Sequence, residues 1–146
     1  MLYLSNNGDT SIIYLNLIDT LDDNALVTTG WSWLINFTND FTKESYQVLQ
    51  ILNQSAFRAR GTNIVIMPIT VDNTGVPNPA YQKMVLIDKG YYTYQIFLQD
   101  SLTNLDIEAA EIVRVVQNGK ALIYNTPEVN YRSEVDGNPN NFIYVP

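Results

Sequence analysis

Two segments of this chain alternate large apolar side chains with smaller or polar ones, and this period of two limits most strongly how the chain can fold. Segment 31–38 places four large apolar residues on one face of an extended backbone: Trp31, Trp33, Ile35 and Phe37. Segment 91–99 does the same with Tyr92, Tyr94, Ile96 and Leu98. Successive side chains point to opposite faces only in a strand. Both segments therefore predict strands with one buried face. We expect Trp33, Ile35, Tyr94 and Ile96 to lie in the core of the protein.

Turn signals separate short apolar or alternating runs along the rest of the chain, a spacing typical of a β-sandwich or barrel. Further strands are expected over 11–17, 45–52, 63–71, 83–87, 112–116 and 121–124. Pro68 cannot donate to a ladder, which predicts an edge position or a bulge. Asn118-Gly119 predicts a type I′ hairpin turn before the last strand. A short helix over 105–116, with Glu108 and Glu111 exposed, is the alternative there.

A chain of 146 residues fits one domain with its own core. The prediction is an all-β, antiparallel two-sheet sandwich over residues 1–124, followed by an extended C-terminal arm over 125–146. Three of the six prolines lie in this arm, which ends in an apolar run: Phe142, Ile143, Tyr144 and Val145. Exposed apolar residues favour association. We therefore expect the arm either to fold back on its own sheet or to add a strand to a neighbour's edge.

Histidine and cysteine are both absent from the sequence. The commonest general base, the usual partner of an activated serine, the thiolate nucleophile and the commonest metal ligand are therefore missing. No G-x-S-x-G elbow, S-x-x-K motif or P-loop occurs. We expect a protein that is not an enzyme, with no catalytic residue, no metal and no cofactor.

Acidic clusters are the one feature that suggests chemistry, and they comprise Asp19, Asp22 and Asp23 in one loop and Asp100, Asp106, Glu108 and Glu111 near another. Their spacing does not match an EF-hand loop. A carboxylate pair for glycoside hydrolysis would need a carbohydrate cleft, for which the domain has little spare chain. We interpret the clusters as solvated loop charges, and a small hydrolase is kept as the enzyme alternative.

The formal net charge of −7 disfavours an anionic partner, because only eight Lys and Arg residues are present and they are scattered. We therefore expect no direct binding to nucleic acid and no attraction to a membrane surface. The first residues have neither a basic region nor a long apolar run, and no stretch approaches the roughly 20 apolar residues that cross a bilayer. The expected protein is made in the cytoplasm and stays soluble.

The aromatic strands also allow a ligand platform, in which Trp31, Trp33 or Tyr91 stacks on pyranose rings. Large aromatics at alternate positions are more often core than platform, so the tryptophans are assigned to the core. The outward side of segment 91–99 holds the better interaction candidates, namely Tyr91, Thr93 and Gln95. This set suits a ligand or a contact between subunits equally well.

Several stretches within residues 31–124 resemble small β-sandwich virion proteins of tailed bacteriophages. They are 37–46 (FTNDFTKESY), 90–97 (GYYTYQIF), 103–106 (TNLD) and 119–121 (GKA). Gln117 stands where that family often has an acidic residue, two positions before the glycine. The resemblance implies an immunoglobulin-like fold and a place in the virion after synthesis in the host cytoplasm.

For function, the resemblance implies a multi-copy, capsid-associated auxiliary or decoration protein. Its partners would be the major capsid protein or neighbouring subunits. A structural protein of the neck or tail is one alternative. A carbohydrate-binding β-sandwich module is the other.

Overall fold

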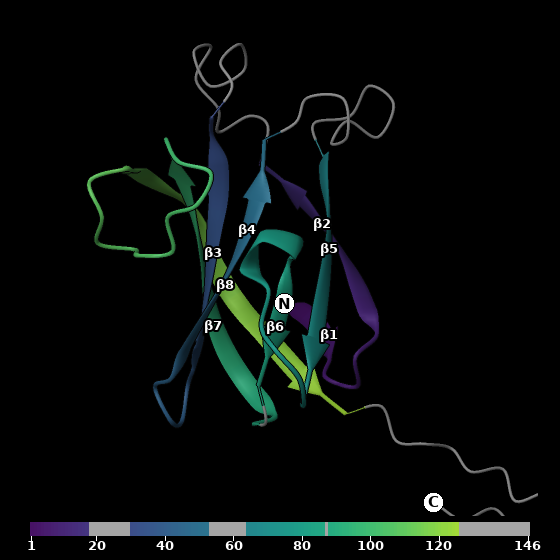
Figure 1. Ribbon diagram of the computed structural model, residues 1–146. Helices are drawn as coiled ribbons and strands as arrows, with labels where there is room; N and C mark the ends of the chain where they lie inside the picture. Colours follow the sequence, from purple (N-terminus) through teal and green to yellow (C-terminus); the bar gives the residue numbers. More distant parts are fainter. Residues whose placement is uncertain (18–29, 53–63, 87, 126–146) are drawn as a thin grey trace, which may run out of the picture.

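The computed structural model describes residues 1–17, 30–52, 64–86 and 88–125 (Figure 1). Its strands are β1 (Leu2–Ser5), β2 (Thr10–Asn16), β3 (Ser32–Asn39), β4 (Ser45–Ile51), β5 (Ile64–Asp72), β6 (Lys83–Val85), β7 (Gly90–Gln99) and β8 (Ile112–Tyr124). A 3₁₀ turn, η2 (Pro79–Tyr81), precedes β6, and the described ranges contain no α-helix. The expectation of an all-β chain is confirmed for this part of the protein. The boundary between 1–124 and a C-terminal arm stays a prediction, because residues 126–146 lie outside the description.

The strands form two sheets that face each other across a shared core (Figure 1). The large sheet has the order β1-β8-β7-β3-β4, and the small sheet has the order β2-β5-β6. Four of the pairings are antiparallel, but β1 pairs with β8 and β5 pairs with β6 in parallel. The prediction of a wholly antiparallel sandwich is therefore corrected at these two pairings. Neither pair is joined by a tight hairpin turn, so nothing in its connection imposes an antiparallel direction.

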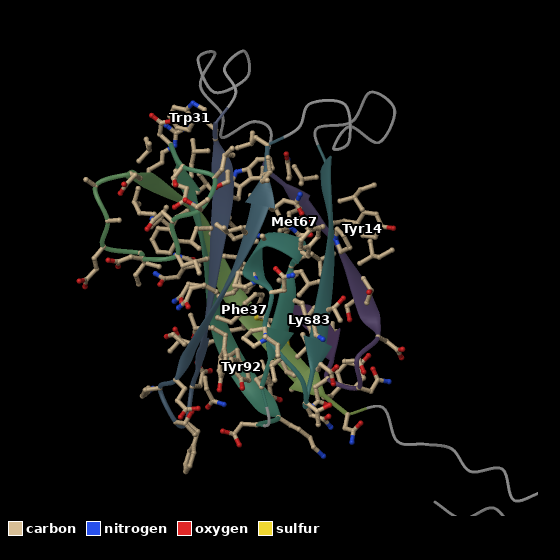
Figure 2. The ribbon with its side chains drawn as sticks, in the orientation of Figure 1. Tyr14, Trp31, Phe37, Met67, Lys83 and Tyr92 are labelled. Atoms are coloured by element: carbon tan, nitrogen blue, oxygen red, sulfur yellow. The ribbon has the colours of Figure 1, made fainter. Side chains whose placement is uncertain are left out.

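One core lies between the sheets and draws on both of them. Trp33, Ile35, Tyr94 and Ile96 are all buried in it, as predicted from the alternation. Phe37 of β3, Met67 of β5 and Tyr92 of β7 project into the same space between the sheets (Figure 2). Burying large apolar side chains contributes about 1.5–3 kcal/mol each, so this core is the main source of stability.

Pro68 was predicted at an edge or a bulge, but β5 is the middle strand of the small sheet and its register with β2 has no bulge; only the side of β5 that faces β6 is open at Pro68. Its neighbour Thr70 donates its N–H to the carbonyl of Gln82, next to β6, so even-numbered residues of β5 direct their backbone groups toward β6. β6 pairs with β5 only from Thr70 onward. An N–H at position 68 would face the side of β5 where no strand of the described chain pairs with it, so proline, which lacks this group, loses no ladder hydrogen bond there.

The expected hairpin at Asn118-Gly119 is wrong, and so is the alternative helix over 105–116. β8 runs without interruption from Ile112 to Tyr124, and Gly119 lies opposite Tyr94 of β7. A Cβ added at Gly119 would lie 2.8 Å from the hydroxyl oxygen of Tyr94 and 2.9 Å from two of its ring carbons. Glycine is present here because the tyrosine ring covers the backbone, and not because a turn needs positive φ.

Replacing Gly119 with Ala should therefore destabilise the protein by about 1–3 kcal/mol, the usual cost of inserting a methyl group into a packed site. This cost would be measured by denaturant unfolding in a double-mutant cycle of four proteins: wild type, Gly119→Ala, Tyr94→Ala and the double variant. The cost of Gly119→Ala should fall to near zero when Tyr94 is already Ala, because the clashing ring is gone. An equal cost in both backgrounds would contradict this contact.

Candidate interaction surface on the large sheet

The outward face of the large sheet carries the three residues of β7 that were predicted as interaction candidates. Tyr91, Thr93 and Gln95 share this face because Tyr92, Tyr94 and Ile96 point into the core. Cross-strand pairing extends each of them into a row: Tyr91 lies opposite Leu122, Thr93 opposite Lys120, and Gln95 opposite Asn118. The structure thus brings the three predicted residues together. It also adds neighbours that are distant in sequence.

The row of Tyr91 is apolar and exposed. Leu122 of β8 pairs with Tyr3 of β1, so two tyrosines flank one leucine across three strands. The exposed fractions are 58% for Tyr91 and 60% for Tyr3. Phe41, in the turn between β3 and β4, is 94% exposed near the same end of the sheet. The backbone N–H of Asp40 donates to the carbonyl of Tyr91 at 3.0 Å, which ties this turn to the start of β7.

A charged network borders the tyrosine row. Lys120 donates to the Asp40 carboxylate at 2.6 Å and to the Thr93 hydroxyl at 2.8 Å, and Thr93 donates to the other Asp40 oxygen at 2.6 Å. The hydrogen bond from Lys120 is the main cause that lowers the pKa of Asp40 below 3.8, and the Thr93 hydroxyl adds to it. The three side chains come from the β3–β4 turn, β7 and β8. They hold one fixed pair of opposite charges beside exposed rings.

The turn that carries Asp40 is itself held in place. The side-chain oxygen of Asn39 accepts from the backbone N–H groups of Phe41 and Thr42, at 2.8 and 3.0 Å. Lys43 then adopts a positive φ of 66°, and its side chain donates to the carbonyl of Asp40 at 2.7 Å. These local bonds are typical of an Asn-initiated turn. They fix the position of the carboxylate before any partner is bound.

Amide side chains form the next row. Gln47 donates to the oxygen of Asn36 at 2.8 Å, and Asn36 donates to the hydroxyl of Thr38 at 3.2 Å. Within the described ranges, by contrast, the side chain of Gln95 has no hydrogen-bond partner. Gln95 therefore presents an unused donor and acceptor in a row without charge.

The far end of this face is covered by the chain itself. Leu34, Leu49 and Phe97 form a small buried cluster, against which Ile107 and Ile112 pack. Two hydrogen bonds of 2.9–3.0 Å join Gln99 to Asn104, and so help to hold the covering segment 100–111 on the sheet. The open part of the outward face therefore comprises the tyrosine, charged and amide rows, together with the exposed Val113 and Val115 of β8.

The other candidates from the sequence are distributed as follows. Trp33 is buried and Trp31 is half-buried against the core, so of the three proposed stacking residues only Tyr91 is exposed. Asp106 accepts the backbone N–H of Glu108 at 2.9 Å and stabilises a turn in the covering segment. The described ranges contain no group of three or more acidic residues that could hold a metal ion.

Two groups of candidates cannot be placed. Asp19, Asp22 and Asp23 lie outside the described residues, and so does the apolar run Phe142, Ile143, Tyr144 and Val145. No helix within the described ranges is long and apolar enough to span a membrane.

Sequence reasoning missed Asp40 and Lys120 as parts of this surface. They are 80 residues apart, and nothing in their local sequence indicates that they meet. Comparisons of the chain with known protein families, curated proteins and solved structures return no match.

The pKa of Asp40 provides a direct test of the network. Replacing Lys120 with Met should raise the carboxyl pKa toward 3.8, because the largest cause of its lowering is removed. An NMR titration of the side-chain carboxyl carbon would measure the change. Lys43→Met is the matched control and should move the pKa much less, since Lys43 is the smallest of the causes named for this carboxyl.

The lowered pKa of Asp40 also determines how this carboxyl group affects the stability of the fold as the pH changes. The Asp40 carboxylate contributes stability above its unfolded-state pKa, and this contribution is lost as the pH falls through the folded-state pKa. Wild type and Lys120→Met should therefore converge in stability at the acid end of the titration. An Asp40 pKa that is the same in both proteins would contradict the network.

Proposed function

We propose that this chain is a non-enzymatic structural component of a tailed-phage virion, a capsid-associated auxiliary or decoration protein with an immunoglobulin-like sandwich. One observation carries the proposal. Three of the stretches that resemble phage virion proteins, 37–46, 90–97 and 119–121, meet on the exposed surface around Tyr91, to which Tyr3 and Leu122 also contribute. Asp40 comes from the first stretch, Thr93 from the second and Lys120 from the third.

The chemistry of this surface suits a protein partner. Tyrosine is enriched at protein interfaces because it offers a large, rigid ring with a polar end. Tyr91, Tyr3 and Phe41 are all more than half exposed on the isolated chain. The pair Asp40–Lys120 gives a partner two fixed charges for orientation, and complementary charges set register and specificity more than affinity. Attachment to a capsid protein or a neighbouring subunit would cover this face.

The proposed arm over 125–146 would add to the attachment. Ordering its backbone costs about 1–2 kcal/mol per residue. Burial of Phe142, Ile143, Tyr144 and Val145 returns about 1.5–3 kcal/mol each, which is too little alone. Strand pairing to an existing sheet edge would supply further stabilisation through ladder hydrogen bonds.

Incorporation into particles tests this function. Tagged protein would be produced in the phage host during infection, and purified particles would be probed for the tag. Wild type should be found in the particles. Tyr91→Ala should lower incorporation about tenfold or more, as expected for an aromatic residue that contributes at least ~1.4 kcal/mol to binding.

Tyr81→Ala is the matched control, because Tyr81 is also an exposed tyrosine (78%, against 58% for Tyr91) and lies on η2, outside the proposed surface. Deletion of residues 138–146 should leave a folded domain that is incorporated poorly. Particles without the wild-type chain would refute the virion role. Normal incorporation of Tyr91→Ala would exclude the β7 surface as the attachment site, and cryo-EM of labelled particles would distinguish capsid from neck or tail.

Glycan binding is a second candidate, supported by two features of the same outward face: the exposed ring of Tyr91 and, four residues or roughly 13 Å further along β7, the amide of Gln95, which has no hydrogen-bond partner within the described ranges. A ring that stacks on a sugar and an amide that bonds its hydroxyls are the usual parts of a neutral ligand site. Titration with a neutral oligosaccharide should then shift the NMR signals of the Gln95 side-chain amide, and Tyr91→Phe should bind while Tyr91→Ala should not. No shift at millimolar oligosaccharide would contradict it.

A further inference from the structure

The edges of the two sheets differ in how they are protected. Exposed edge strands are prone to pair with other chains, and proteins usually shorten, charge or cover them. β1 has four residues and β6 has three, one of which is Lys83. The free edge of β4 is contacted by the segment around η2, where Gln82 donates to the carbonyl of Leu49. β2 is a seven-residue edge strand without charge or proline, and its register with β5 has no bulge.

The backbone groups on the outer side of β2 can be identified from the register. Thr70 and Asp72 of β5 direct their backbone groups toward β6, since they bond Gln82 and Leu86 there. Odd residues of β5 therefore bond β2, and their partners are Ser11, Ile13 and Leu15. Even residues of β2 point their N–H and C=O groups away from the sheet. Within the described ranges, these groups of Ile12 and Tyr14 have no partner.

The side chains of the same even residues form an apolar patch that reaches this edge. Ile12 is 56% exposed and Tyr14 is 64% exposed, and Figure 2 shows Tyr14 pointing away from the space between the sheets. On β5, Pro68 lies opposite Ile12 and Ile66 lies opposite Tyr14. The patch thus carries no charge on either strand. It extends to the outer edge of β2, where the backbone groups of Ile12 and Tyr14 have no partner within the described ranges.

We propose that β2 pairs antiparallel with β2 of a second copy of this chain, which joins the two small sheets into one. The free backbone groups define the register. Ile12 of each copy lies opposite Tyr14 of the other copy. The two Ile13 residues lie opposite each other, at the twofold axis. This register satisfies the free backbone groups of Ile12 and Tyr14 and places an aromatic ring beside a β-branched side chain twice, a favourable cross-strand pair. The strand is therefore complementary to itself.

Charge favours the same arrangement. Each chain carries a net charge of −7, but β2 contributes none of it. In the antiparallel pair the two Asp9 carboxylates lie about eight residues apart, or roughly 26 Å at ~3.3 Å per residue. That separation exceeds the Debye length of ~8–10 Å in ordinary buffers. Parallel pairing would instead place the two Asp9 side chains next to each other.

The contact is small. A single strand pair with two exposed side chains per copy buries less than the ~1,200–2,000 Å² of a standard stable interface. We therefore expect a weak dimer in solution, with a dissociation constant in the micromolar to millimolar range. This association goes beyond the virion role and does not require it, because it is a property of the isolated chain.

Sedimentation equilibrium of the full chain from micromolar to millimolar concentration tests the proposal. Wild type should shift from monomer to dimer. Ile12→Lys should weaken the dimer at least tenfold, because it places a charge in the patch at an exposed position that the fold does not need buried. Val113→Lys is the matched control, since Val113 is a similarly exposed apolar residue of β8, and it should dimerise like wild type.

Hydrogen exchange gives a second readout that a change in folding would not mimic. The amides of Ile12 and Tyr14 should become more protected as concentration rises, whereas those of Ile13 and Leu15, which bond β5, should not change. Tyr14→Pro removes one edge N–H without removing a bond to β5, and it should also abolish the dimer.

Three results would overturn the proposal. The first is a wild-type protein that stays monomeric at millimolar concentration. The second is a dimer that Ile12→Lys leaves intact. The third is a dimer that is lost on deletion of residues 126–146 while both β2 variants retain it, which would assign the association to that segment.

Discussion

The register between β3 and β7 determines which side chains enter the core and which face outward. Ile35 lies opposite Ile96, and Phe37 lies opposite Tyr94. A slip of one residue in either strand would turn its whole apolar set to the outside and bury amides such as Asn36 between the sheets. The bulk of Trp33 makes such a slip especially costly, because it is fully buried. The register of β3 and β7, two of the three inner strands of the large sheet, is therefore fixed by their own side chains.

The outward surface follows from the same register. Because Tyr92 and Tyr94 must point inward, Tyr91 and Thr93 must point outward, and pairing with β8 then places Lys120 beside Thr93. The β3–β4 turn emerges next to the start of β7 and brings Asp40 to both. A surface built from three distant stretches thus needs no separate scaffold. Its rigidity comes from the core directly beneath it.

The parts of the fold that the sequence predicted are those in which local pattern and burial agree. Segments 31–38 and 91–99 alternate because one face of each carries the large apolar side chains of the core between the sheets, and both contain strands. Asn118-Gly119 misled the prediction because a glycine needed for contact with the ring of Tyr94 looks, locally, like a turn glycine. The pair Asp40–Lys120 could not be predicted, since it depends on a pairing between strands that lie far apart in the chain. Patterns within a short stretch of sequence do not indicate which distant strands pair.

The four edge strands of the two sheets differ in the features that would prevent them from pairing with another chain. A single charge or proline on a solvent-facing position blocks edge pairing at little cost to the fold, because such a position is not packed. Ile12 and Tyr14 occupy two positions of this kind on β2, yet both are apolar and more than half exposed. Elsewhere the same chain keeps its edges short, charges them with Lys83 or covers them through Gln82. Within the described ranges, β2 has none of these devices, and its outward backbone groups can pair with the same groups of a second β2. Such an edge has the chemistry of a contact surface.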